Sequence, residues 1–192
     1  MSFEVRPRVA VFASGKGSNF EAMMNSPERE FDVVMLVCDQ PKAHVIGLAA
    51  GFGVETVILD PDQFASKEEY EKEILKKLKR ANVQWIVLAG YMRIVGDVLL
   101  EAYPNKILNI HPSLLPSFPG KNAVQQALDY GVKVSGVTIH FVDEGIDTGP
   151  IIAQEPVTVF PKDTNETLQS RIQQVEHVLY TKVINEVTKS SQ

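Results

Sequence analysis

Short apolar runs alternate with polar or helical segments over the first 112 residues of this chain. The apolar runs predict strands over residues 8–14, 31–39, 54–60, 83–91 and 106–112. The segments between them predict helices over residues 19–25, 44–53 and 66–81. Continuous apolar strands that alternate with helices are typical of a parallel sheet covered by helices on both faces.

The pattern changes in the last third of the chain. Residues 132–143 and 149–159 predict two strands joined by a short loop, so they should pair antiparallel. A final helix is expected over residues 163–188, where apolar side chains form one stripe. The prediction is an α/β fold: a single three-layer sandwich with a Rossmann-like parallel half and mixed C-terminal strands. We expect one domain over residues 1–192, with ligands beyond the C-terminal ends of the parallel strands.

Composition and charge narrow the classes of function. The chain has 192 residues, a net charge of −5 and a pI near 5.4, which argues against nucleic-acid binding driven by overall charge. Its single cysteine, Cys38, excludes an intramolecular disulfide and a zinc site built on thiolates. No metal-binding spacing is recognisable, and no apolar run approaches the ~20 residues of a membrane span. We therefore expect a cytoplasmic protein without a metal, a nucleic-acid partner or a membrane partner.

A glycine-rich loop, SGKGSN at residues 14–19, follows the first predicted strand and opens the first predicted helix. Glycine lets the backbone approach an anion, and a helix N-terminus offers unpaired N–H groups and the positive end of the helix dipole. The interpretation we prefer is a site for one phosphate monoester, held by Gly17, Ser18 and Asn19. A tight turn in which Ser18 caps the helix fits the loop alone equally well.

Two nucleotide-binding patterns fit this loop poorly. The Walker pattern requires Gly-Lys-Ser/Thr after a four-residue gap, which the loop lacks. The dinucleotide pattern requires a third glycine where this chain has Phe20. Asp39 ends the second predicted strand at a suitable distance for a ribose, so a dinucleotide stays open as an alternative.

Polar side chains interrupt the fifth predicted strand, KILNIHP. Residues two apart on a strand point to the same face, so Asn109 and His111 should project together. Both can donate hydrogen bonds, and two convergent donors can stabilise a developing oxyanion. A histidine in this role benefits from a carboxylate partner, which the acidic loop VDEGIDTG offers as Asp143, Glu144 or Asp147. Spacing does not select among them, although the nearby glycines let the backbone bend closest at Asp147.

Each of these side chains also has a structural explanation. A lone histidine at a strand end is often a surface or satisfied core residue, and Asn109 or Asp147 could merely bond a loop or cap a turn. The same explanation applies to the other histidines: His44, His140 and His177. His140 alternates within the sixth predicted strand and is expected to be structural. No nucleophile is obvious, since Cys38 lies far along the chain from His111. This favours direct transfer between two bound substrates over covalent catalysis.

Four sequence blocks together resemble a known family. The blocks are SGKGSN, LAGYMRIV, NIHPSLLPSFPG and DEGIDTGPII, in this order, and the resemblance covers roughly residues 8–187. They resemble the formyltransferases that use 10-formyltetrahydrofolate, in particular the single-domain members of purine synthesis. The resemblance implies the formyltransferase fold. It also implies transfer of a formyl group from 10-formyltetrahydrofolate, a co-substrate, to the primary amine of glycinamide ribonucleotide.

The resemblance also assigns roles to residues. It implies that Asn109, His111 and Asp147 are catalytic, which selects Asp147 from the acidic loop. The ribonucleotide and its phosphate are expected on Gly17, Ser18, Asn19 and Glu176. The folate is expected on Lys67, Met92, Arg93, Ile94, Val95, Asn109 and Asp143. Relatives often have arginine where this chain has Lys67, and lysine cannot make the bidentate contact of arginine.

We expect the two halves of the domain to have different tasks. Residues from about 8 to 100 would bind the phosphate, and residues from about 101 to 188 would hold the catalytic groups and the folate. In the mechanism that the resemblance implies, the amine attacks the formyl carbon, Asn109 and protonated His111 stabilise the oxyanion, and Asp147 keeps His111 charged and oriented. Protons then pass from the amine to the leaving N10 of the folate.

Three alternatives are left open. A formyltetrahydrofolate hydrolase shares the fold but usually carries an N-terminal regulatory domain, for which the residues before Arg8 leave no room. A methionyl-tRNA formyltransferase carries a C-terminal RNA-binding domain, which we do not expect here. A non-catalytic nucleotide-binding module predicts that Asn109, His111 and Asp147 need not meet. Beyond small-molecule substrates, the sequence leaves open whether the chain forms a homodimer.

Overall fold

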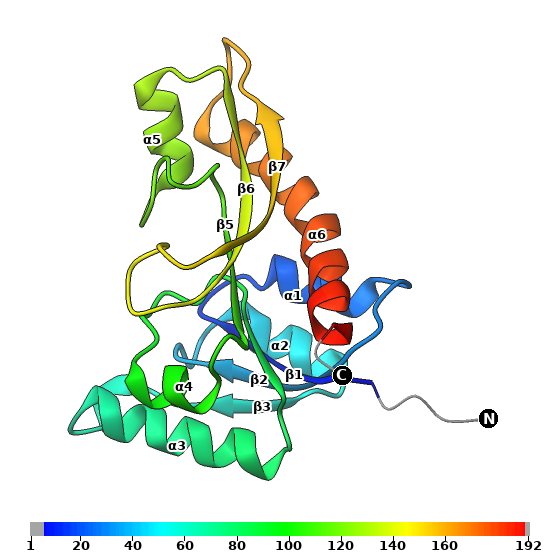
Figure 1. Ribbon diagram of the computed structural model, residues 1–192, viewed down its shortest axis with the longest axis vertical. Helices are drawn as coiled ribbons and strands as arrows, with labels where there is room; N and C mark the ends of the chain where they lie inside the picture. The colour runs from blue at the N-terminus through cyan, green and yellow to red at the C-terminus, as the bar shows by residue number, and fades with distance from the viewer. Residues whose placement is uncertain (1–5, 191–192) are drawn as a thin grey trace.

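The computed structural model describes residues 6–190, and one seven-stranded sheet runs through this part of the chain (Figure 1). The strands are β1 (Arg8–Ala13), β2 (Asp32–Cys38), β3 (Glu55–Ile58), β4 (Trp85–Leu88), β5 (Ile107–His111), β6 (Val134–Phe141) and β7 (Ile151–Thr158). Their order is β3-β2-β1-β4-β5-β6-β7. The first five strands are parallel, whereas β6 pairs antiparallel with β5 and with β7. The predicted parallel half and mixed C-terminal strands are confirmed.

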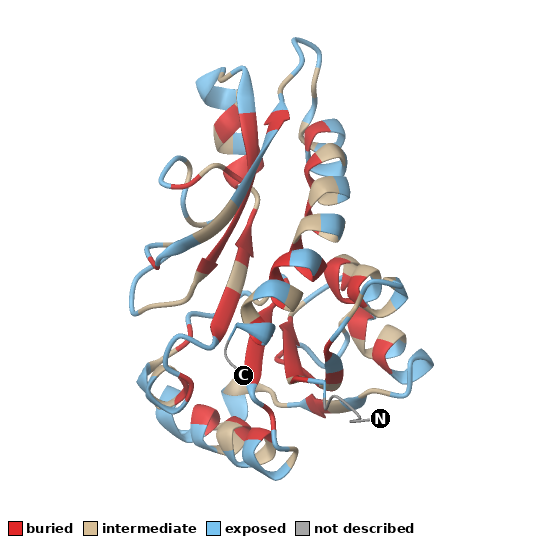
Figure 2. Ribbon diagram, turned by 45° about the vertical axis from the view of Figure 1, so that its right-hand side comes forward, coloured by how far each residue is buried: buried red, intermediate tan, exposed pale blue. Residues whose placement is uncertain are grey.

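Helices cover both faces of the sheet, which makes three layers. They are α1 (Ser18–Asn25), α2 (His44–Gly51), α3 (Lys67–Arg80), α4 (Asp97–Ala102), α5 (Ala123–Tyr130) and α6 (Asn165–Lys189), with a 3₁₀ helix at Pro61–Gln63. One apolar core joins the sheet to α1, α2, α5 and α6, and the other joins it to α3 and α4. Buried residues concentrate on the strands and on the inward faces of the helices (Figure 2). No helix within residues 6–190 is long and apolar enough to cross a membrane.

Two helices were not expected from the pattern. α4 spans only six residues, which is too short for a periodic stripe to be recognised. α5 begins after Asn122 and ends before Gly131, and both flanking residues have left-handed backbone conformations, with φ of 60° and 80°. Asn and Gly tolerate this conformation best, so the chain can enter and leave a short helix sharply there.

Strand β5 has different side chains on its two faces. Leu108 and Ile110 face the core that contains α6, and Ile107 faces the core that contains α3 and α4. Because side chains alternate along a strand, Asn109 and His111 share the face of Ile107. A polar pair therefore continues an apolar face, and this places both side chains beside a cavity.

Candidate active site

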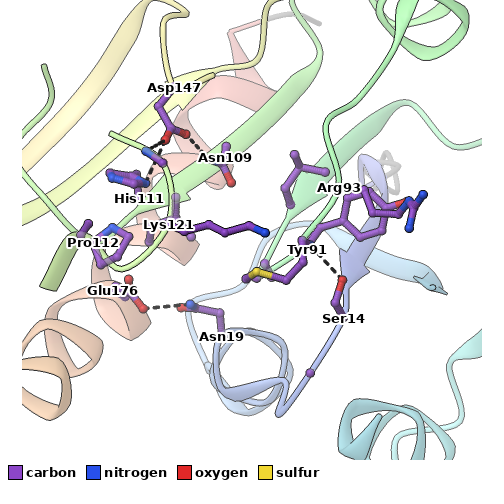
Figure 3. Close-up of a pocket in the computed structure, with 18 of the residues that line it drawn as sticks. Ser14, Asn19, Tyr91, Arg93, Asn109, His111, Pro112, Lys121, Asp147 and Glu176 are labelled. Carbon is purple, nitrogen blue, oxygen red and sulfur yellow. Dashed lines mark hydrogen bonds and ion pairs between the residues drawn. The ribbon is translucent and has the colours of Figure 1, made fainter. Parts of the chain in front are cut away.

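A cavity of about 940 Å³ lies where the loops after β1 and β4 meet the polar face of β5. The glycine-rich loop, residues 91–95, the loop after His111, the acidic loop and α6 all contribute to its lining. Figure 3 shows side chains from these separate segments converging on one space. A volume of this size is typical of sites that enclose a large ligand or two smaller ones.

The structure brings Asn109, His111 and Asp147 together. Asp147 Oδ2 lies 3.3 Å from His111 Nδ1, and Asp147 Oδ1 lies 3.4 Å from the amide nitrogen of Asn109. The backbone N–H of Gly120 donates to Asp147 Oδ2 at 2.7 Å. Asp147 has a left-handed backbone with φ of 55°, which an aspartate tolerates better than most residues. The acidic loop thus bends back over β5 at the position that the sequence suggested.

The surroundings of Asp147 favour its ionised form. Burial raises its pKa, but hydrogen bonds from His140 and the Gly120 amide, together with the charge of His111, outweigh burial and lower it. The carboxylate therefore stays charged at neutral pH and can hold a protonated imidazole. Its side chain is only 12% exposed, so water screens this interaction poorly.

Both ring nitrogens of His111 face protein acceptors. Nδ1 faces Asp147, and Nε2 lies 2.8 Å from the backbone carbonyl of Phe118. A histidine donates from both nitrogens only when it is protonated, so the arrangement is suited to an imidazolium. Phe118 has a φ of 56°, which is unusual for a bulky residue. Its ring packs edge-on against Tyr130 of α5, with the ring centroids 5.9 Å apart.

A second histidine, His140, belongs to the same cluster, which the sequence analysis did not expect. Its Nε2 lies 3.2 Å from the Asn109 amide nitrogen and 3.6 Å from Asp147 Oδ1. Its Nδ1 lies 2.8 Å from the Phe141 carbonyl and can donate to it. Nε2 then accepts from Asn109 when the ring is neutral and donates to Asp147 when the ring is protonated. His140 directly opposes Asn109 in the β5–β6 pairing. The sequence analysis expected a structural role for His140 and did not predict its contact with Asn109, because that contact depends on the register between β5 and β6.

The glycine-rich loop meets α1 without a side-chain cap. Gly17 is the N-cap residue of α1, with φ of 79°, and Ser18 does not cap the helix. A Cβ atom at Gly17 would lie 2.5 Å from Val45 Cγ2, so both the conformation and the space require glycine. The alternative of a turn capped by Ser18 is therefore wrong.

Asn19 connects this loop to the last helix. Its amide nitrogen donates to Glu176 Oε2 at 3.0 Å, and its carbonyl oxygen is buried with no hydrogen-bond partner among residues 6–190. Burial raises the pKa of Glu176, and the hydrogen bond from Asn19 lowers it by less. Both side chains line the cavity (Figure 3).

Residues 92–95 form an apolar edge of the cavity. The N–H of Met92 donates to Ser14 Oγ at 2.9 Å, which ties this segment to the loop after β1. The side chains of Met92 and Ile94 remain 66% and 54% exposed, although large apolar side chains usually avoid water. The Arg93 guanidinium lies 5.7 Å from the centre of the Tyr70 ring, in cation–π geometry.

Other candidate residues differ in their placement. Asp143 lines the cavity, and its Oδ1 accepts hydrogen bonds from the Gly145 amide and the Thr148 hydroxyl, which shapes the acidic loop. Lys67 is not part of the cavity lining, and its ammonium lies 4.0 Å from Glu71. Asp39 is 2% exposed and also lies outside the lining, which disfavours a ribose contact. Lys121, which the sequence analysis did not single out, extends into the cavity (Figure 3).

Histidine, cysteine and acidic side chains do not form a metal-binding group of three or more anywhere in residues 6–190. A carboxylate, an imidazolium and an amide beside one cavity can stabilise negative charge on a substrate oxygen.

Comparisons with known proteins identify relatives over almost the whole chain. A family model described as formyl transferase matches residues 7–184. The chain is 49% identical over 183 residues to the phosphoribosylglycinamide formyltransferase of Bacillus subtilis, which covers 94% of each protein. It is 44% identical over 174 residues to the trifunctional purine biosynthetic protein adenosine-3 of Gallus gallus, which covers 88% of this chain and 17% of that protein.

Solved structures of the same kind superpose closely on this chain. Glycinamide ribonucleotide transformylase 1 from Geobacillus kaustophilus matches with a TM-score of 0.93 and 49% identity, over 95% of this chain and 99% of that chain. Phosphoribosylglycinamide formyltransferase from Bacillus halodurans matches with a TM-score of 0.93 and 48% identity, over 96% of this chain and 97% of that chain. From the matched sequence model and these relatives together, the chain belongs to the formyl transferase family.

Proposed function

We propose that this protein transfers the formyl group of 10-formyltetrahydrofolate to the primary amine of N1-(5-phospho-D-ribosyl)glycinamide, a step of de novo purine synthesis. The products are formylglycinamide ribonucleotide and tetrahydrofolate. The observation that carries the proposal is the Asn109–His111–Asp147 cluster beside a cavity large enough for two substrates. Relatives named for this reaction, at 49% identity over nearly the whole chain, support it.

The reaction needs stabilisation of a tetrahedral oxyanion. The amine nitrogen forms a bond to the formyl carbon, the bond from that carbon to N10 of the folate breaks, and a proton passes from the amine to N10. In our proposal Asn109 and protonated His111 donate hydrogen bonds to the oxygen that becomes negative, while Asp147 holds the imidazolium in place. No covalent enzyme intermediate is required.

The hydrogen bonds of His111 suggest which N–H serves the oxyanion. A charged carboxylate is a stronger acceptor than a backbone carbonyl, so the N–H that faces Asp147 is the harder one to remove. We infer that the Nε2–H exchanges the Phe118 carbonyl for the oxyanion during the reaction. The exchange replaces a neutral acceptor by a charged one, so the new hydrogen bond forms most strongly when the oxygen is negative.

Two ends of the cavity suit the two substrates. The uncapped N-terminus of α1, with Gly17, Ser18 and Asn19, suits the phosphate of the ribonucleotide, and Glu176 suits its ribose or amine. The exposed apolar side chains of Met92 and Ile94 suit the flat rings of the folate. Arg93, Val95 and Asp143 complete the proposed folate contacts, whereas the placement of Lys67 gives no support to its proposed contact.

The proposal treats the chain as one catalytic domain. Residues from about 8 to 100 supply the phosphate loop, and residues from about 101 to 188 supply the catalytic groups, although the proposed folate segment lies at the end of the first half. We also propose that the partners are the two small-molecule substrates and that the protein works in the cytoplasm, as suits an enzyme of purine synthesis.

A transfer assay at neutral pH tests the function. Folate deformylation would be followed with 10-formyltetrahydrofolate present, with and without the ribonucleotide. We expect turnover only with the ribonucleotide, and loss of turnover in His111→Ala. Turnover without it would instead identify a hydrolase. Folded protein with no turnover in either mixture would refute the proposed function and leave a binding module. Asp147→Asn should also lower turnover, and Asp129→Asn is its matched control, since Asp129 is an exposed carboxylate hydrogen-bonded by Gln125.

A further inference from the structure

Helix α3 carries a buried carboxylate among exposed charges. Glu71 is 3% exposed, whereas its charged neighbours Glu68, Glu69 and Lys72 are exposed. Burial raises the pKa of Glu71, and the Gly96 amide and the charge of Lys67 lower it by less. An apolar side chain at a buried position is often as stable as a buried ion pair or more so. Burial alone therefore does not explain a carboxylate at this position, and its hydrogen-bond partner has to be considered.

Glu71 caps a helix other than its own. Its Oε1 accepts a hydrogen bond from the Gly96 N–H at 2.6 Å, and Gly96 is the N-cap residue of α4. α4 has no side-chain cap from its own N-cap residue. An acceptor at this point pairs an N–H group that a helix start leaves unpaired and favours the positive end of the helix dipole. Glu71 thus fixes the point at which the chain leaves residues 92–95.

The other end of residues 92–95 is also fixed by a side chain. The N–H of Met92 donates to Ser14 Oγ, 2.9 Å away, so Ser14 and Glu71 hold the backbone at the two ends of the segment. Between these anchors the side chains of Met92 and Ile94 stay largely exposed. A short segment with a fixed backbone and exposed apolar side chains is preorganised for a flat ring, because little entropy remains to be lost on binding.

The space around Gly96 shows how closely Glu71 and Lys67 approach it. A Cβ atom at Gly96 would lie 2.9 Å from Glu71 Oε2 and 2.8 Å from Lys67 Cε. Lys67 Nζ lies 4.0 Å from Glu71 Oε1 and so supplies a counter-charge at the rim of the contact. A methyl group at position 96 would displace these flexible side-chain ends and disturb the same hydrogen bond without changing Glu71.

We propose that Glu71 is a positioning residue for the folate substrate: by capping α4 at Gly96 it holds residues 92–95 in the conformation that binds the folate rings. The inference rests on the proposed function, because it takes residues 92–95 as the folate contact. It assigns no contact between Glu71 and either substrate. Its effect should therefore fall on folate binding rather than on the ribonucleotide or on the chemical step.

The test compares three variants with a control. Glu71→Leu removes the acceptor, Glu71→Gln keeps an acceptor without the charge, and Gly96→Ala disturbs the contact from the other side. Glu68→Leu is the control, since Glu68 is an exposed glutamate of α3 paired with Lys72. For Glu71→Leu and Gly96→Ala we expect KM for 10-formyltetrahydrofolate to rise about tenfold, as for one lost hydrogen bond to a charged group. KM for the ribonucleotide and kcat should change less than about twofold, and Glu71→Gln should restore most of the affinity.

Two readouts are independent of turnover. The affinity for tetrahydrofolate, the proposed product, would be measured by calorimetry and should fall by the same factor as KM rises. Amide hydrogen exchange at residues 92–96 should speed up in Glu71→Leu and Gly96→Ala and stay unchanged in Glu68→Leu. Thermal unfolding identifies a variant that fails to fold, in which case Glu71→Gln and Gly96→Ala still decide.

The outcomes separate this inference from the proposed function. If wild-type protein shows no transfer, the proposed function fails, whereas the exchange data still report whether Glu71 holds the segment. Suppose instead that wild-type transfer is normal. If Glu71→Leu and Gly96→Ala raise KM equally for both substrates, or raise KM for neither substrate, Glu71 is only structural and the inference is overturned. Faster exchange at residues 92–96 with unchanged folate affinity would overturn it as well.

Discussion

The Asn109–His111–Asp147 cluster and the glycine-rich loop line one cavity, but they differ in how completely the protein satisfies their polar groups. Asp147 accepts from the Gly120 amide and the Asn109 side chain, and both nitrogens of His111 face acceptors. By contrast, the carbonyl oxygen of Asn19 has no partner among the described residues, and α1 has no side-chain cap.

This difference indicates two kinds of work. Groups that must stabilise a transition state benefit from fixed orientation before the substrate arrives. In the proposed mechanism only the hydrogen bond from His111 Nε2 to the Phe118 carbonyl then has to change during the reaction. Buried polar groups without protein partners are unusual in folded proteins and are suited to a ligand that supplies the missing partner. We therefore infer that the cluster serves the chemical step and the loop serves binding, so mutations in the two regions should affect different kinetic constants.

The largest effect on activity should come from mutations in the Asn109–His111–Asp147 cluster. We expect His111→Ala and Asp147→Asn each to lower kcat by at least about 10²–10³, the usual loss for one oxyanion donor or its partner. KM for the ribonucleotide should change little, since the phosphate loop is intact. Steady-state kinetics with each substrate varied in turn would measure this. A change confined to KM would contradict the division between the two regions.

Glu176→Gln should mainly change KM rather than kcat, the opposite of the effect expected for the cluster. The variant keeps an acceptor for Asn19 but removes the charge proposed to contact the ribose or amine of the ribonucleotide. KM for the ribonucleotide should therefore rise about 10- to 100-fold, as for a lost hydrogen bond to a charged group. We expect kcat at saturating ribonucleotide to stay within about threefold of wild type. Equal losses in kcat and kcat/KM would instead place Glu176 with the catalytic groups.

A comparison of Gly17 in the glycine-rich loop with Gly53, which lies outside the cavity lining, separates the cost of backbone strain from the cost of a steric clash. Gly17 and Gly53 both have positive φ, but only at Gly17 would a Cβ atom meet a neighbour, Val45. We expect Gly53→Ala to lower the free energy of unfolding by about 1 kcal/mol and Gly17→Ala by about 2–4 kcal/mol. Urea unfolding would measure both. Equal losses would show that the contact with Val45 relaxes without cost.

The dependence of stability on pH should report Glu176 directly. Its pKa is raised in the folded protein by burial, so folding favours the protonated form. The stability contribution is present at low pH and is lost as pH rises through the folded-state pKa. Relative to Glu176→Gln, the wild type should therefore lose stability as pH rises above about 4.3, the ordinary pKa of a glutamate. Thermal unfolding of both proteins from pH 4 to 8 would measure the difference, and a gap that does not change with pH would contradict the burial argument.

The smallest effect is expected at Lys67. Its side chain is 52% exposed, lies outside the cavity lining and is 4.0 Å from Glu71, so water screens its charge. We expect Lys67→Met to change KM for 10-formyltetrahydrofolate by less than about threefold, because the bond between Glu71 and Gly96 remains. A tenfold increase in this KM would instead support the direct contact between Lys67 and the folate that the sequence analysis expected.

Features that depend on nearby residues could be predicted from the sequence. Continuous apolar runs identified the five parallel strands, because burial on both faces favours apolar side chains at most strand positions. The shared face of Asn109 and His111 followed from the two-residue period of a strand. Selection of Asp147 among three acidic residues depended on family resemblance, and the structure shows the bend that brings it to His111.

Contacts between distant segments were decided by the tertiary structure alone. Asn19 and Glu176 are 157 residues apart, and His140 joins the cluster only through the register of β5 and β6. In the sequence Glu71 resembles the surface charges around it on α3, and only the packing of α4 against α3 shows its hydrogen bond to Gly96. α4 itself is too short to be predicted from periodicity. Local periodicity is set by neighbours a few residues away, so the sequence alone determined the layers of this protein and the identity of its polar strand. Which distant side chains meet depends on loop paths and strand register, which only the folded chain specifies.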